Sequence, residues 1–121
     1  GMLAPGVKIT DVDAFERKAL DERGLYLSQV PPRYRSTYFL HVFGGGYAAG
    51  YYSYLWTQVL ESNIFDWFVE HGGMTAENGQ RLRDLVLSRG NSQPVKDLFA
   101  AFTGRLAPDM KSLIRARGLA D

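Results

Sequence analysis

The hydrophobic pattern along the chain predicts helices and no convincing strand. A first helix is expected to begin at Asp11 or Asp13, either of which can cap it, and to stop at Gly24. After a short extended stretch, Pro31-Pro32 prevents any helix from crossing that point. The periodicity of residues 33–43 fits either a short helix or an irregular stretch.

The longest proline-free stretch with apolar residues at helical spacing runs from Tyr47 to about Glu70, and His71-Gly72-Gly73 ends it. It predicts one long central helix. Three shorter helices are expected to follow, from Thr75 to about Arg89, from Ser92 and Pro94 to Gly104, and from Pro108 to Gly118. The fold class is therefore all-α, as a single helical domain over residues 3–121. Gly1-Met2 has the form of a remnant left by tag removal before an initiator.

Composition narrows the class of protein. The chain has 121 residues, of which 45% are hydrophobic and 22% charged, values typical of one globular domain or of a piece of a larger one. It has no cysteine, which removes disulfides, thiolate zinc sites and a cysteine nucleophile. A net charge of +1 gives no electrostatic case for binding nucleic acid or an anionic membrane. No apolar run approaches the roughly 18 to 20 residues of a membrane span, and no signal peptide opens the chain.

Aromatic residues are concentrated in one segment, since 11 of the 16 fall between Tyr38 and Phe68. Within it, Tyr47, Tyr51 and Tyr54 are spaced i, i+4 and i+7, which would place them on one face of the predicted helix. A packed stripe is one interpretation. A polar cleft wall is equally compatible, because each buried hydroxyl needs a partner and phenols are good donors to a developing oxyanion.

The two histidines, His41 and His71, are 30 residues apart and no His-Glu-x-x-His pair is present, so we expect no complete metal site in this chain. His71 is expected to cap the central helix. His41, taken alone, is more typical of a structural histidine. The run Gly44-Gly45-Gly46 lacks the strand and spacing of a phosphate-binding loop and favours a hinge or a close backbone approach.

A family resemblance is carried by HVFGGGYAAGYYSYLW, residues 41–56. This run resembles the signature near the C-terminus of the thimet oligopeptidase family of zinc metallopeptidases, and within it the bacterial peptidyl-dipeptidases (dipeptidyl carboxypeptidases). Residues 30–34, 87–92 and 117–119 resemble the same family in the same order. Mammalian oligopeptidases have one residue fewer between the histidine and the first tyrosine, so the triple glycine matches the bacterial form.

The resemblance implies that this chain is the C-terminal piece of a larger, two-lobed helical peptidase and forms one wall of its substrate channel. Zinc would be held by a His-Glu-x-x-His helix and a later glutamate outside this chain, so no metal ligand and no cofactor is expected within it. The residues matching His41 and Tyr54 would stabilise the oxyanion. Those matching Tyr47 and Tyr51 would lie along the peptide, and the loop with Gly45 and Gly46 would move as the channel closes.

The expected partners are short unstructured peptides and the remainder of the parent peptidase. A group must hold the C-terminal carboxylate of the substrate, and Arg33, Arg35 and the tyrosines are all candidates. The isolated chain is expected to be inactive and to self-associate through Phe39, Phe43, Trp56, Phe65 and Trp67. The compartment would be the cytoplasm or periplasm of a bacterium, with the cytoplasm favoured. The alternative is a stand-alone helical module that binds a peptide or protein without catalysis.

Overall fold

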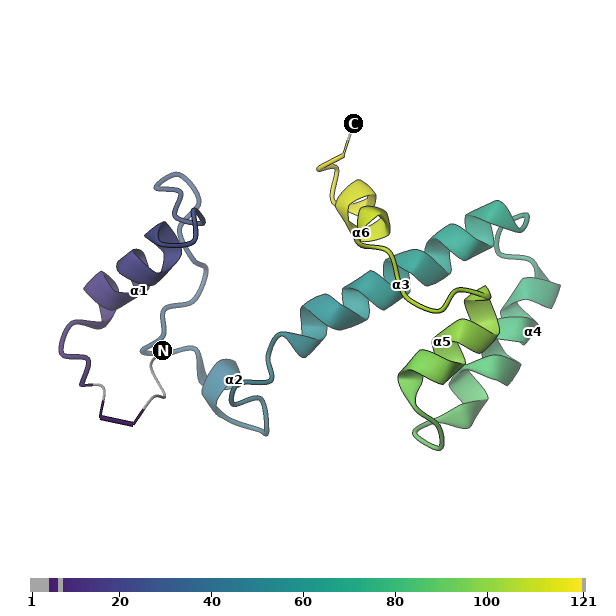
Figure 1. Ribbon diagram of the computed structural model, residues 1–121, viewed down its shortest axis with the longest axis horizontal. Coiled ribbons are helices and arrows are strands. Elements are labelled where there is room, and N and C mark those ends of the chain that lie inside the picture. Colours follow the sequence, from purple (N-terminus) through teal and green to yellow (C-terminus); the bar gives the residue numbers. More distant parts are fainter. Residues whose placement is uncertain (1–4, 7, 121) are drawn as a thin grey trace. The chain divides into compact units, whose positions relative to one another are not determined.

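The computed structural model describes residues 5–6 and 8–120, so the interpretation of Gly1-Met2 lies outside the described residues. All regular structure in this part is helical, which confirms the all-α prediction. The elements are α1 (Val12–Asp21), α2 (Leu40–Phe43), α3 (Ser53–Glu70), α4 (Ala76–Leu85), the 3-10 helix η1 (Leu87–Arg89), α5 (Val95–Thr103) and α6 (Met110–Ala116) (Figure 1). None of the helices described is long and apolar enough to cross a membrane.

The chain divides after Tyr51 into two compact units, which we describe separately. In the first unit, the carboxylate of Asp11 accepts the N–H of Ala14 at 2.9 Å and caps α1. Gly24 has a φ of 65°, and the N–H of Leu25 returns to the carbonyl of Leu20 at 2.9 Å. This pattern is a Schellman motif, so the predicted beginning and end of the first helix are confirmed.

The sequence left open whether residues 33–43 are helical or irregular. The chain is irregular up to Phe39 and helical over Leu40–Phe43. The carbonyl of Arg35 accepts the N–H groups of Tyr38 at 3.1 Å and Phe39 at 3.0 Å, which closes a tight turn. No described residue of the first unit is fully buried. Local hydrogen bonds and partly covered side chains therefore hold this unit together, rather than an apolar core.

The long helix begins at Ser53, so the prediction that it starts at Tyr47 is wrong. Gly45, Gly46 and Ala49 have φ values of 63°, 85° and 58°, in the left-handed region that no right-handed helix can include. Tyr47 lies between these residues, in a series of turns. The three tyrosines therefore do not share one helix face.

His71 ends α3, as the sequence predicts. Its Nδ1 lies 2.7 Å from the carbonyl oxygen of Trp67, and its ring stacks on Trp67 with centroids 4.0 Å apart and an interplanar angle of 12°. The interpretation of His71 as a capping residue is confirmed. Trp67 itself is 6% exposed and packs in the core, so its predicted exposure is wrong. It faces the helices that follow α3 rather than solvent.

The later helices follow the predicted order with shifted boundaries. Thr75 caps α4 by accepting the N–H of Asn78 at 3.2 Å, but α4 ends at Leu85 and η1 continues to Arg89. α5 begins after Pro94, and no side chain caps it. α6 is capped by Asp109, which accepts the N–H of Lys111 at 2.8 Å, and not by Pro108. A carboxylate can accept an orphan N–H at a helix start, whereas proline has no such group.

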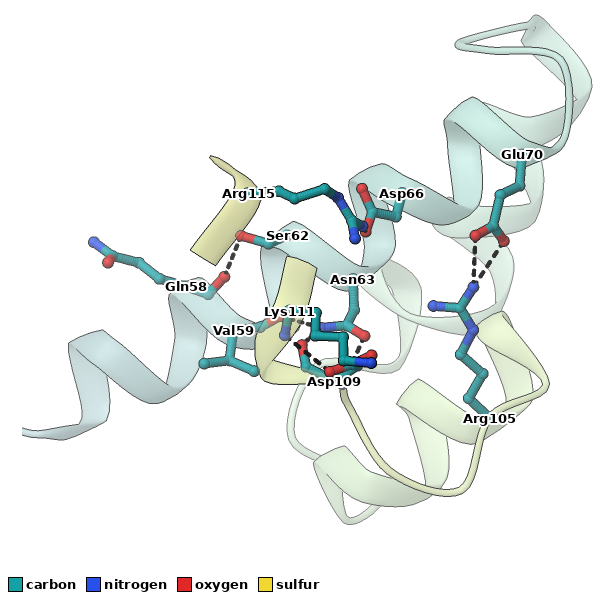
Figure 2. A network of polar contacts seen from close by, with 10 residues as sticks. All are labelled: Gln58, Val59, Ser62, Asn63, Asp66, Glu70, Arg105, Asp109, Lys111 and Arg115. Atoms are coloured by element: carbon teal, nitrogen blue, oxygen red, sulfur yellow. Dashed lines mark hydrogen bonds and ion pairs between the residues drawn. The ribbon is translucent and has the colours of Figure 1, made fainter. Parts of the chain in front are cut away.

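The core of the second unit forms where α3, α4 and α5 meet. Trp67, Phe68 and Phe102 are buried together, and Ile64, Leu82, Leu85 and Val86 pack against them. Arg81 links α4 to the end of α5, since its Nη2 donates to the carbonyls of Ala101 at 3.1 Å and Phe102 at 2.9 Å. On α3, Glu70 accepts two bonds from Nη2 of Arg105, at 2.8 and 2.7 Å (Figure 2).

A buried amide joins α6 to α3. Asn63 is completely buried, and its Nδ2 donates to the carbonyls of Val59 at 2.8 Å and Asp109 at 2.7 Å. Its Oδ1 accepts the N–H of Asp109 at 2.8 Å, so one side chain satisfies both backbone groups of the residue that caps α6 (Figure 2). An ion pair between Asp66 and Arg115 lies one turn further along the same two helices.

Candidate functional site

The predicted site residues before α3 lie in a folded-back loop. His41 is carried by α2, which ends where the N–H of Gly44 donates to the carbonyl of Leu40 at 2.7 Å. Gly45 and Gly46 then take left-handed φ values and reverse the chain. Nothing lies within 4 Å of the place where a Cβ would stand at either position, so backbone conformation rather than space favours glycine here. The reversal returns Tyr47 to His41.

Three aromatic side chains meet at this loop, and we call His41, Tyr47 and Tyr51 the aromatic triad. The ring of His41 lies 4.8 Å from that of Tyr47 and 5.4 Å from that of Tyr51, centroid to centroid, with interplanar angles of 82° and 78°. The two tyrosine rings are 6.2 Å apart at 72°. All three contacts are edge-to-face, the favourable geometry for aromatic pairs.

The triad continues into further rings that the sequence reasoning did not assign to the site. Phe39 meets Tyr51 edge-to-face at 5.1 Å, and Tyr34 lies against Phe39 at 4.8 Å. The one signal for these residues was the density of aromatics around His41, which does not say which rings touch. The structure adds Phe39 as the direct support of Tyr51.

Tyr54, the second predicted catalytic residue, belongs to the second unit. It lies in the first turn of α3 and is 40% exposed, and its backbone carbonyl accepts the hydroxyl of Thr57 at 3.0 Å. Of the four predicted aromatic site residues, the structure therefore brings three together within the first unit. The fourth, Tyr54, lies in α3 of the second unit.

A carboxylate on α1 anchors the segment that leads into the triad. Glu16, with a side chain 11% exposed, accepts the backbone N–H of Ser36 and lies 3.3 Å from Nη1 of Arg35. Burial alone raises the pKa of Glu16, but the hydrogen bonds from Ser36 and Arg35 outweigh it and hold the pKa below its ordinary value of 4.5. No local pattern in the sequence marks this residue, because its partners lie 19 and 20 positions away.

The two arginines considered for the substrate carboxylate have different surroundings. Arg35 lies 3.3 Å from Glu16 and 3.7 Å from Asp13, so two carboxylates already surround its charge. The guanidinium of Arg33 lies over the ring of Tyr34, 5.4 Å from the centroid. A cation over an aromatic face keeps its full charge. Arg33 is therefore the better placed of the two to attract an anion.

A zinc ion needs several His, Cys, Asp or Glu side chains that converge on one point. Over the part of the chain that the structure describes, no group of three or more His, Cys, Asp or Glu side chains could hold a metal ion. The described residues therefore do not fit zinc as ligands. What the triad can do is donate and accept hydrogen bonds through imidazole and phenol groups and offer ring surface to a bound chain.

Comparisons with known proteins give matches over nearly the whole chain. The model of peptidase family M3 matches residues 6–119. The chain is 52% identical over 118 residues to a dipeptidyl carboxypeptidase of Salmonella typhimurium, covering 98% of this chain and 17% of that protein. It is 53% identical over 109 residues to a dipeptidyl carboxypeptidase of Escherichia coli, covering 90% of this chain and 16% of that protein.

A relative with another name matches as well. Oligopeptidase A of Escherichia coli is 47% identical over 81 residues, covering 67% of this chain and 12% of that protein. The chain spans about a sixth of the length of the curated dipeptidyl carboxypeptidases that it matches. Because the family model covers nearly all of its residues, this chain belongs to peptidase family M3.

Proposed function

We propose that this chain forms part of the substrate channel of an enzyme that releases dipeptides from the C-terminus of short, unstructured peptides. The observation that carries the proposal is the aromatic triad, in which the glycine loop brings Tyr47 and Tyr51 against His41. The two matched dipeptidyl carboxypeptidases, each more than half identical, support this reaction over general oligopeptide cleavage.

Each site residue has a proposed role. His41 and Tyr54 donate hydrogen bonds to the carbonyl oxygen of the scissile peptide bond, and these bonds strengthen as negative charge develops there. Tyr47 and Tyr51 lie along the bound peptide. Gly45 and Gly46 let the loop between them move as the channel closes.

The metal belongs to the rest of the enzyme in this proposal. Zinc, when bound there, supplies an activated water for peptide hydrolysis. Since the described residues of this chain do not fit zinc as ligands, its own contribution is limited to binding, orientation and hydrogen bonding. The isolated chain is therefore proposed to be inactive.

The remainder of the peptidase is the proposed partner of α3. Large apolar side chains on this helix are exposed, among them Leu55, Trp56, Phe65 and Val69. A helix with apolar residues on nearly every face is typical of the interior of a larger protein. We place the enzyme in a bacterial cytoplasm or periplasm. A stand-alone binding module is the second candidate, since the same exposed faces could hold another protein.

Replacing Tyr54 by Phe in the full-length peptidase tests the catalytic role. The substitution removes a donor and keeps the ring, so kcat is expected to fall about 10²- to 10³-fold with KM nearly unchanged. Tyr52→Phe is the matched control, because Tyr52 is a neighbouring tyrosine that is 74% exposed. Steady-state kinetics distinguish the two candidates, and a near-normal kcat for Tyr54→Phe would contradict the proposed role.

A further inference from the structure

We propose that Glu16 is a positioning residue for the aromatic triad: its carboxylate fixes the turn from Arg35 to Phe39, and Phe39 in turn holds Tyr51 against His41. The inference rests on the proposed role of the triad as a substrate site. Helix α1 carries none of the predicted site residues, but through Glu16 it would help to position the triad. All the contacts involved lie within the first unit.

The first step is the contact between α1 and the turn. The Glu16 side chain is 11% exposed, whereas that of Asp13, one turn earlier on the same helix, is 77% exposed. Glu16 accepts the backbone N–H of Ser36, and its Oε2 lies 3.3 Å from Nη1 of Arg35. Charge-assisted hydrogen bonds of this kind are stronger than neutral ones. In a unit without a buried core they are a principal restraint on this segment.

The second step leads from the turn to the triad. The carbonyl of Arg35 accepts the N–H groups of Tyr38 and Phe39, so fixing Arg35 also fixes the backbone of Phe39. The Phe39 ring then lies edge-to-face on Tyr51 at 5.1 Å, and Tyr51 lies 5.4 Å from the ring of His41. A displacement of the turn would therefore disturb the contact between Phe39 and Tyr51.

The charges around Glu16 determine how the restraint depends on pH. Glu16 lines a pocket beside α1 together with four other titratable residues, Asp13, Arg17, Tyr26 and Arg35. The guanidinium of Arg17 lies 4.8 Å from the ring centroid of Tyr26, and its Nε lies 4.0 Å from a carboxylate oxygen of Asp21. Arg35 is therefore the cation that pairs with Glu16. Folding lowers the pKa of Glu16 below 4.5. Its contribution to the stability of the folded first unit is therefore fully present above pH 4.5, and it is lost as the pH falls through the lower pKa of the folded state.

The test is an NMR comparison of the 121-residue chain with its Glu16→Gln variant. Glutamine keeps the shape and removes the charge, so the nuclear Overhauser effects between the Phe39 and Tyr51 rings are expected to weaken at least about twofold. Asp13→Asn is the matched control, since Asp13 also faces Arg35, at 3.7 Å, but is solvent-exposed. The indole signal of Trp67 reports on the second unit and should not change in either variant.

Acid titration of the unsubstituted chain gives an independent measurement should Glu16→Gln fail to fold. The same ring contacts should weaken as pH falls below 4.5. In the full-length peptidase, Glu16→Gln should lower kcat/KM about tenfold and Asp13→Asn should not. Unchanged ring contacts in Glu16→Gln, or an equal loss in Asp13→Asn, would overturn the proposal. The ring contacts and their acid titration do not depend on the kinetics of Tyr54→Phe. The positioning role of Glu16 and the catalytic role of Tyr54 can therefore be contradicted separately.

Discussion

At the scale of single residues, a buried polar group places α6. Asn63 has no exposed surface, and its amide satisfies the carbonyl of Val59 and both backbone groups of Asp109. An apolar side chain at this position would remove the hydrogen bonds that Asn63 makes to both backbone groups of Asp109. The position of α6 on α3 therefore depends on hydrogen bonding at one residue as well as on the contact made by Leu113, which is 7% exposed.

Asn63→Leu is expected to destabilise the second unit by about 1 to 3 kcal/mol, because the volume is kept while the hydrogen bonds to Asp109 are lost. Denaturant unfolding followed by the fluorescence of buried Trp67 measures the change. Ser62→Ala is the control, since the hydroxyl of Ser62 bonds only to the carbonyl of Gln58 within α3, at 2.8 Å. A loss for Asn63→Leu no greater than for the control would show that apolar packing alone places α6.

At this scale the sequence predicts contacts between residues that are close together along the chain. Asp11, Thr75 and His71 were identified as helix-end residues because a cap bonds to groups within a few positions of itself. Asn63 and Glu16 were not identified, since their partners lie 46 and 20 residues away. An isolated amide or carboxylate on a helix carries no sign of such a partner.

At the scale of elements, the error at the start of α3 has a clear cause. Apolar spacing continues from Tyr47 into the helix, so periodicity alone predicts one element. The conformation of the glycine-rich run overrides that pattern, and even Ala49 takes a left-handed φ of 58°. The loop that results brings Tyr47 and Tyr51 to His41, which a continuous helix from Tyr47 would not.

Gly46→Ala tests that conformation. Its φ of 85° is strained for alanine at a cost of about 1 to 2 kcal/mol, so the contact between the rings of Tyr47 and His41 should loosen. Gly50→Ala is the control, because the φ of Gly50 is not positive and a Cβ there would meet nothing closer than 3.8 Å. Ring-to-ring nuclear Overhauser effects measure both variants. Equal effects would mean that the left-handed conformation is not what places Tyr47.

At the scale of the whole molecule, exposed apolar surface is the main feature. In the second unit a groove of about 630 Å³ is lined by apolar side chains, Ile64, Phe65 and Phe68 among them, together with polar and charged ones. Phe65 is 58% exposed, and of the five residues predicted to be exposed Trp67 alone is buried. The resemblance to part of a larger peptidase predicts that large apolar residues are exposed, but it does not show which of them the core covers.

The isolated chain is expected to self-associate through this surface, because exposed apolar patches of this kind drive association. Sedimentation velocity over a range of concentrations measures it. Phe65→Glu should shift the distribution towards monomer, since it replaces an exposed aromatic ring with a charged side chain. Leu106→Glu is the control, at a residue that is 94% exposed and outside the groove. A chain that stays monomeric at high concentration would contradict the prediction.

The isolated chain lacks the residues that peptide hydrolysis by a zinc enzyme requires. The 121-residue chain has two histidines 30 positions apart and no His-Glu-x-x-His motif, so we expect it to release no dipeptide with or without added Zn²⁺. Its imidazole and phenol groups can stabilise an oxyanion, but they do not generate the nucleophile that attacks the peptide bond. A short peptide with a free C-terminus is the substrate, and the full-length peptidase is the positive control. Release of dipeptides by the chain alone, stimulated by Zn²⁺ and blocked by a chelator, would show that it holds a metal site of its own.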